Sequence, residues 1–131
     1  MGKKKNESID ITPEWYWVKG LHDARVTGAE AYEIPFNYNK YIEENGKTDR
    51  SVFILSVDAK GAIYDSDVKE IRLYNYKILS NNELVINDGI WWMGDSLTEE
   101  NGSFVLEIEF YNYAELFTFK IKFERAEVDR D

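Results

Sequence analysis

The chain has 131 residues, which suits one domain that buries about two-thirds of the surface its unfolded form exposes. It contains no Cys, so a disulfide framework, a thiolate metal site and a cysteine nucleophile are excluded. Lys and Arg number 16 against 25 Asp and Glu, and the net charge of −9 disfavours nucleic acid and anionic membranes as partners. Such a charge favours a basic protein partner, although acidity also simply keeps a protein soluble.

The N-terminal region begins with residues 1–10, which are nearly all polar or charged and are predicted to be flexible. No stretch of the chain is long and apolar enough for a membrane span or a signal peptide, so we expect a cytoplasmic protein. A single β domain is predicted over residues 11–125. Its first element is a short helix from Pro13 to Lys19, because a capping Thr precedes the proline and Gly20 follows. A Trp of this helix is expected to plug an open end of the sheet.

The middle of the chain alternates apolar segments with turn residues, which is typical of an antiparallel β protein. The segment Ser51–Asp58 is apolar almost throughout, and this predicts a central strand buried on both faces. Further strands are predicted at Leu21–Thr27, Ala31–Tyr38, Val68–Leu79 and Leu84–Trp92, and a long polar loop at Met93–Asn101.

The segment Ser103–Phe123 has the clearest alternation of apolar and polar residues. A period of two indicates strands with one buried face, since successive side chains point to opposite sides of a sheet. The segment therefore predicts a hairpin with an inward-facing set that consists of Phe104, Leu106, Ile108, Phe110, Phe117, Phe119, Ile121 and Phe123.

The register of this hairpin is predicted from its charges. Placing Glu109 opposite Lys120 and Glu107 opposite Lys122 pairs each carboxylate with a cation. That register needs a two-residue turn. Because no Gly serves such a turn, a looser loop that starts at Asn112 is the alternative.

The fold class follows from the elements taken together. About seven short strands with turn signals and one helix predict a mainly β fold, either a single-domain antiparallel curved sheet or a half-open barrel. Residues 126–131 are mostly charged and are predicted to be a frayed tail.

The residues that commonly carry chemistry do not form a recognisable catalytic motif. His22 and Asp23 are adjacent, and neighbours in a strand point to opposite faces, so a catalytic pair is not expected. One His and no Cys leave zinc without its usual ligands, and Asp65, Asp67 and Glu70 supply only part of a calcium loop. No phosphate-binding loop or nucleophile elbow is present. We therefore predict no catalytic residue, no cofactor and no metal.

The aromatic content indicates a binding surface. The pattern V-x-E-I-x-(L/F)-Y-N-Y occurs at Val68–Tyr76 and again at Val105–Tyr113, and Tyr residues in both copies lie on the solvent-facing parity. Two consecutive Trp residues cannot both face inward in a regular strand. Exposed aromatic residues beside acids are typical of protein interfaces, although a second layer of structure would also cover them. The candidate partner-binding residues are Tyr74, Tyr76, Trp91, Trp92, Asp95, Glu107 and Tyr111.

The block Trp15–Val26, which reads WYWVKGLHDARV, and the strands ending in Tyr-Asn-Tyr resemble a group of small bacterial β-rich proteins. Some members of this group are immunity proteins of polymorphic toxin systems. The resemblance implies a non-catalytic domain that binds and neutralises a cognate toxin, and an acidic body would suit the cationic groove of a nuclease. The alternatives are a small-molecule or carbohydrate-binding β domain with a cleft lined by Trp91 and Trp92, and, third, an enzyme that joins His22 to a distant carboxylate.

Overall fold

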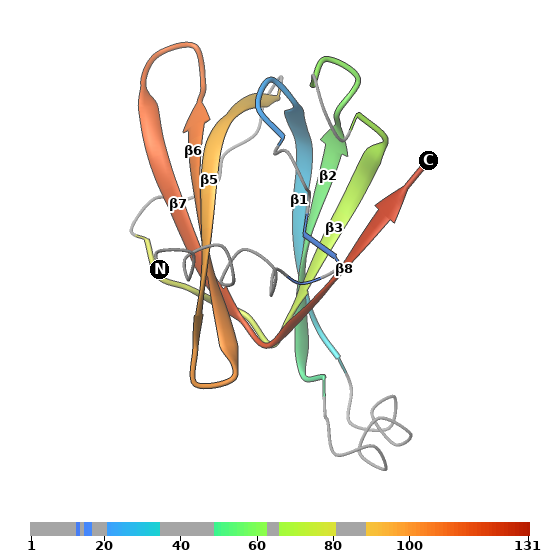
Figure 1. Cartoon of the computed structure of the whole chain (residues 1–131), viewed down its shortest axis with the longest axis vertical. Helices are drawn as coiled ribbons and strands as arrows, with labels where there is room; N and C mark the ends of the chain where they lie inside the picture. The colour runs from blue at the N-terminus through green and yellow to red at the C-terminus, as the bar shows by residue number, and fades with distance from the viewer. Residues whose placement is uncertain (1–12, 14, 17–20, 35–48, 63–65, 81–88) are drawn as a thin grey trace, which may run out of the picture.

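The computed structural model describes residues 13, 15–16, 21–34, 49–62, 66–80 and 89–131. They form a mainly β structure, with eight antiparallel strands in one open sheet of order β4-β7-β6-β5-β1-β2-β3-β8 (Figure 1). In the described ranges no helix is long and apolar enough to cross a membrane. The strands are β1 (Arg25–Glu33), β2 (Ser51–Asp58), β3 (Val68–Tyr74), β4 (Lys77–Ile78), β5 (Ile90–Glu100), β6 (Ser103–Tyr111), β7 (Leu116–Phe123) and β8 (Arg125–Arg130).

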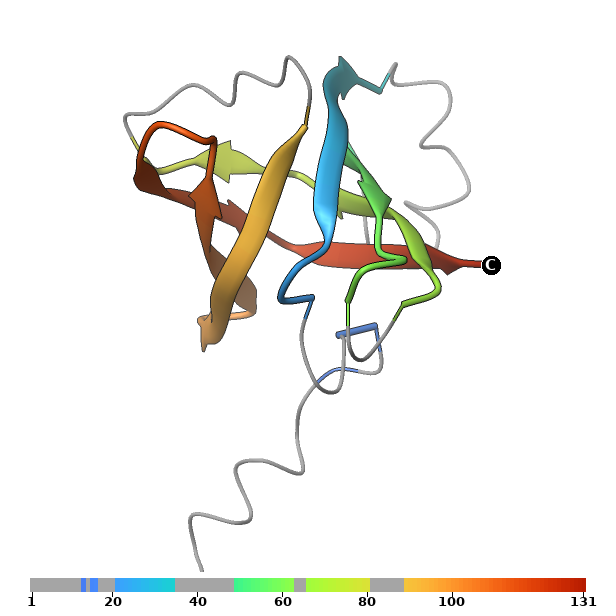
Figure 2. The same ribbon diagram turned by 90° about the horizontal axis from the view of Figure 1, so that it is seen from above.

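The sheet is curved into two arms, as Figures 1 and 2 show. One arm holds β5, β6 and β7, and the other holds β1, β2 and β3. After β3 the chain crosses to pair β4 with β7, and after β7 it crosses back to pair β8 with β3. Tyr74 pairs with Arg125 and Lys77 with Lys122, so the two crossings run beside each other at the narrow end of the fold. The prediction of a curved antiparallel sheet is confirmed.

The core lies between the two arms. The predicted alternation of β6 and β7 is confirmed, because the inward-facing residues from Leu106 to Phe110 and from Phe119 to Phe123 are fully buried or nearly so. The arms meet where Phe53 of β2 stacks on Phe119 of β7, with ring centroids 5.7 Å apart. Burial of each such side chain contributes about 1.5–3 kcal/mol, so this interdigitation stabilises the curvature.

The predicted N-terminal helix is not confirmed. Of its residues the structure describes Pro13, Trp15 and Tyr16, and these form a turn in which the Tyr16 N–H donates to the Pro13 carbonyl over 3.0 Å. The Trp15 ring packs edge-on against Phe104 and Phe123, with centroids 5.7 and 5.6 Å away. A Trp therefore covers the end of the core as expected, although it stands on a turn.

The hairpin of β6 and β7 has a different register from the predicted one. Glu107 lies opposite Lys120, and Glu109 lies opposite Thr118. A shift of two residues keeps every side chain on its predicted face, so the apolar alternation cannot distinguish the two registers. The cost of the actual register is that Glu109 has no cation across the strand.

The loop of this hairpin explains the shift. The looser connection that begins at Asn112 is the correct alternative, and the two-residue turn is wrong. The Asn112 side-chain oxygen accepts hydrogen bonds from the backbone N–H groups of Ala114 and Glu115, each 3.0 Å long. Tyr113 takes the left-handed conformation, with φ of 74°. Asn112 thus caps the loop and its neighbour makes the turn.

Two predicted strands are divided or shortened by residues with positive φ. Residues 21–24 form a turn with Asp23 at φ 76°, so the first strand begins later, at Arg25, and continues through Gly28 to Glu33. Asn75, at φ 56°, separates β3 from β4. Predictions that fall on residues 1–10, 35–48 and 81–88 lie outside the described residues.

Two segments expected to be irregular are strands. The predicted loop Met93–Asn101 belongs almost entirely to β5, where a register shift between Trp92 and Gly94 interrupts the alternation. The predicted frayed tail 126–131 belongs to β8 up to its penultimate residue. Its two apolar residues pack against the core, and its charges meet partners on β3.

Candidate functional site

The outer face of β3 and β8 carries a network of paired charges centred on Arg72. The guanidinium of Arg72 donates to Glu70 over 2.6 Å, to Glu127 over 3.1 Å and to Asp129 over 2.7 and 3.0 Å. These hydrogen bonds from Arg72 lower the pKa of Asp129. The charges of this face are therefore satisfied within the molecule.

The same network holds Tyr74, one of the predicted binding residues. Arg125 binds the carboxylate of Asp49 through both of its oxygens, at 3.1 and 2.6 Å, and Asp49 is only 3 % exposed. The Arg125 guanidinium also lies 4.0 Å from the Tyr74 ring centroid, while the Tyr74 hydroxyl donates to Glu127 over 2.9 Å. Burial acts to raise the pKa of Glu127, but hydrogen bonds from Arg125, Tyr74 and Arg72 outweigh it and lower that pKa.

The outer face of β5, β6 and β7 has a different character at the end near the hairpin loop. Trp91 pairs with Tyr111, and Tyr111 pairs with Leu116. The Trp91 indole N–H donates to the Tyr113 hydroxyl, and Arg25 of β1 lies 5.8 Å from the Trp91 ring. Tyr113 and Leu116 are 58 % and 57 % exposed. We call Trp91, Tyr111, Tyr113 and Leu116 the aromatic patch.

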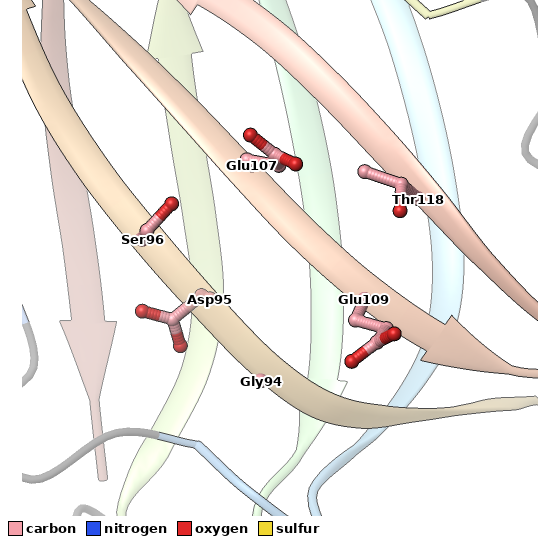
Figure 3. Close-up of a pocket in the computed structure, with 6 residues that line it drawn as sticks. All are labelled: Gly94, Asp95, Ser96, Glu107, Glu109 and Thr118. Atoms are coloured by element: carbon pink, nitrogen blue, oxygen red, sulfur yellow. The ribbon is translucent and has the colours of Figure 1, made fainter.

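A shallow hollow of about 240 Å³ lies on the same face (Figure 3). Figure 3 shows Glu107 and Glu109 on β6, with Gly94 on the neighbouring β5 and Thr118 on β7. A Cβ atom at Gly94 would meet no atom within 4 Å, so the absence of a side chain there keeps the surface open. Neither glutamate forms an ion pair with any residue that the structure describes. The remaining lining residues are Asp95 and Ser96.

Asp95 and Trp92, two of the predicted binding residues, have structural roles. Trp92 is 0 % exposed, and its indole N–H donates to the Asp95 carboxylate over 2.8 Å. The Tyr16 hydroxyl donates to the other oxygen of that carboxylate. Asp95 therefore satisfies a buried donor and ties the N-terminal turn to β5, while Trp92 does not reach the surface.

The other five predicted binding residues divide into three groups. Trp91, Glu107 and Tyr111 lie together on the outer face of β5 and β6. Tyr74 lies on the opposite arm, and Tyr76 packs its ring 5.4 Å from that of Phe53. Sequence reasoning missed Glu109, Tyr113, Leu116 and Thr118, although Glu109 shares the parity of Glu107 and was available from the alternation.

The two Tyr-Asn-Tyr segments are not equivalent. Asn75 lies at the bend between β3 and β4, where its side chain accepts from the Arg50 N–H over 2.6 Å. Asn112 caps a hairpin loop instead. Tyr76 packs against the core and Tyr113 is exposed, so the repeated pattern does not mark a pair of matching binding loops.

The side chains of His22 and Asp23 lie closer together than the sequence predicted. Their side chains meet, with the His22 Nδ1 atom 3.2 Å from an Asp23 carboxylate oxygen. The expectation that they would face opposite sides assumed a strand, but both residues lie in a turn, with about half of each side chain exposed. Across the described parts of the chain, no group of three or more His, Asp or Glu residues is placed to hold a metal ion.

No known protein family, curated protein or solved structure matches the chain. One outer face has its charges paired internally, and the other presents Glu107 and Glu109, which form no ion pair within the described part of the chain, beside the aromatic patch.

Proposed function

We propose that the protein is a non-catalytic binding domain for a basic protein partner, and that it serves as an immunity protein that neutralises a cationic toxin. The observation that carries the proposal is the outer face of β5, β6 and β7. There Glu107 and Glu109, which have no ion-pair partner among the described residues, lie beside the aromatic patch, of which Tyr113 and Leu116 are exposed. Large rigid aromatic side chains next to charge are typical of binding hot spots.

The charge of the whole molecule supports the same partner. A net charge of −9 attracts a cationic surface from a distance and raises the rate of association. Once in contact, aromatic rings provide contact area at low entropy cost, and carboxylates bind Lys or Arg side chains. A partner with a cationic nucleic-acid groove, such as a nuclease toxin, meets both requirements. The protein would then act in the cytoplasm, where such a toxin reaches its substrate.

Carbohydrate or small-molecule binding has less support. That function was expected to use a cleft lined by both Trp91 and Trp92. The two rings lie on opposite faces of β5, with Trp92 in the core, so no cleft is lined by both. The hollow beside Glu107 is shallow and polar, which suits a charged side chain better than an apolar ligand.

A peptide-display selection tests the proposal. A library of random peptides is selected against the full chain, with a variant that carries Glu107→Lys and Glu109→Lys as the counter-target. We expect enrichment of peptides rich in Lys and Arg that bind the wild type and not the variant, and whose affinity falls as salt is raised. A matched Glu33→Lys variant, changed on β1 away from this face, should bind them nearly as well. Enriched peptides without a basic bias, or with equal affinity for the doubly changed variant, contradict the proposal.

The immunity role has a separate test in cells. The chain is co-expressed in a bacterial host with each member of a panel of basic nuclease toxins, and growth is measured. Protection against one member, lost in the doubly changed variant and kept in Glu33→Lys, supports the role. Growth arrest by every toxin in the panel counts against the immunity role and leaves basic-protein binding to the display experiment.

A further inference from the structure

We propose that this face recognises an extended segment of the partner in which an apolar residue and a Lys or Arg stand two positions apart. The inference rests on the proposed function and specifies its partner. Tyr111, Glu109 and Glu107 occupy alternate positions of β6, so all three project from the same outer face. The face thus presents an aromatic side chain and two carboxylates in a line.

The spacing of this line selects the conformation of the partner. Alternate residues of a strand are about 7 Å apart, because each residue advances the chain by 3.2–3.4 Å. An extended segment repeats its own side chains at the same interval. An extended segment can therefore place an apolar residue against Tyr111 and the aromatic patch. The residue two positions away on the same side of the segment then meets Glu109. A helix presents side chains on one face every three or four residues and loses this register over three contacts.

The two carboxylates are not equivalent, and this gives an order of importance. Glu109 lies opposite Thr118 on β7, beside the open space at Gly94. Glu107 lies opposite Lys120, whose positive charge competes for it. The position that faces Glu109 therefore requires a cation more strictly than the position that faces Glu107.

The peptides enriched against the full chain, together with synthetic copies of the tightest binder, test the inference. We expect an aromatic or aliphatic residue two positions from Lys or Arg. A single Gly inserted between them should weaken binding about tenfold or more, since it turns the two side chains to opposite faces. Glu109→Gln should remove the preference for a cation and weaken binding about tenfold, whereas Glu107→Gln should weaken it less. Tyr111→Ala should remove the apolar preference, and Glu33→Gln should change nothing.

The outcomes separate the inference from the function on which it rests. Basic peptides with no fixed spacing, or with the apolar and basic residues three or four positions apart, overturn the extended register but leave a basic partner in place. The same holds if Glu107→Gln costs more affinity than Glu109→Gln. Peptides without basic enrichment overturn both.

Discussion

The hydrogen bond from Trp92 to Asp95 within β5 is expected to contribute strongly to the stability of the fold. The Trp92 ring is fully buried, and its N–H donates to Asp95. Asp95→Ala removes the carboxylate that accepts from this buried donor, and the loss of such a hydrogen bond costs about 1–3 kcal/mol. The Tyr16 hydroxyl loses its acceptor as well, but it is only partly buried and water can replace that bond. We therefore expect Asp95→Ala to lower the free energy of unfolding by an amount in the upper half of that range.

A double-mutant cycle isolates the indole contribution. Trp92→Phe removes the N–H and keeps an aromatic ring, so Asp95→Ala should cost less in that background, with a coupling of about 1–2 kcal/mol. Asp95→Asn is the matched control, because its amide oxygen still accepts from the indole, and its loss should be smaller than that of Asp95→Ala. Free energies of unfolding come from urea titrations followed by far-ultraviolet circular dichroism. An equal cost of Asp95→Ala in both backgrounds would refute the reasoning.

Three further predictions concern the charge network and the hairpin loop. Asp49→Ala should lower the free energy of unfolding in urea by about 1–3 kcal/mol because it removes the carboxylate that binds Arg125 through both oxygens and leaves Glu127 as its remaining ion pair, and a loss below ~0.5 kcal/mol would contradict this. At Tyr113, Gly should be more stable than Ala by about 0.5–1 kcal/mol in the same assay because φ is positive, and the reverse order would be inconsistent with the turn. Because folding lowers the pKa of Glu127, ionised Glu127 stabilises the fold at pH values above its pKa in the unfolded chain. That stabilisation is lost as the pH falls through the lowered pKa. Between about pH 5 and pH 2, the Tm of Arg72→Met should therefore fall less steeply with pH than the Tm of the wild type. Parallel curves of Tm against pH would argue against the network.

Much of the sheet follows from local patterns in the sequence. The alternation in β6 and β7 predicts their faces correctly because each side chain there has a simple choice between core and solvent. The strand Ser51–Asp58 was predicted to the residue, since its apolar run has no competing interpretation. The register of the hairpin was wrong because two registers bury the same side chains, and loop geometry at Asn112 decides between them.

The segments missed by sequence reasoning are stabilised by distant partners. The C-terminal strand β8 looks like a frayed tail because most of its residues are charged, yet Arg72 of β3 and Asp49 bind those charges across the sheet. In β5 a bulge after Trp92 breaks the alternation, so the strand resembles a polar loop. Neither feature has a local signal in the chain.

The positions of the candidate residues on the sheet were predicted in part. Glu107 and Tyr111 were placed correctly on the outer face because their parity is clear. Tyr74 has the same solvent-facing parity, but in the folded protein it contacts Glu127 and Arg125 of the ion network. That network forms only when distant segments come together. Trp92 could not be separated from Trp91 because the sequence does not show which of two neighbours faces inward.

The central claim is that Glu109 binds a cation of the partner, and a charge exchange tests it most directly. The affinity of the tightest selected peptide is measured for the wild type and for Glu109→Lys, with its facing basic residue either kept or changed to Glu. We predict that each single change weakens binding about tenfold or more, and that the two changes together restore most of the affinity. A doubly changed pair that binds no better than the singly changed pairs would contradict the account.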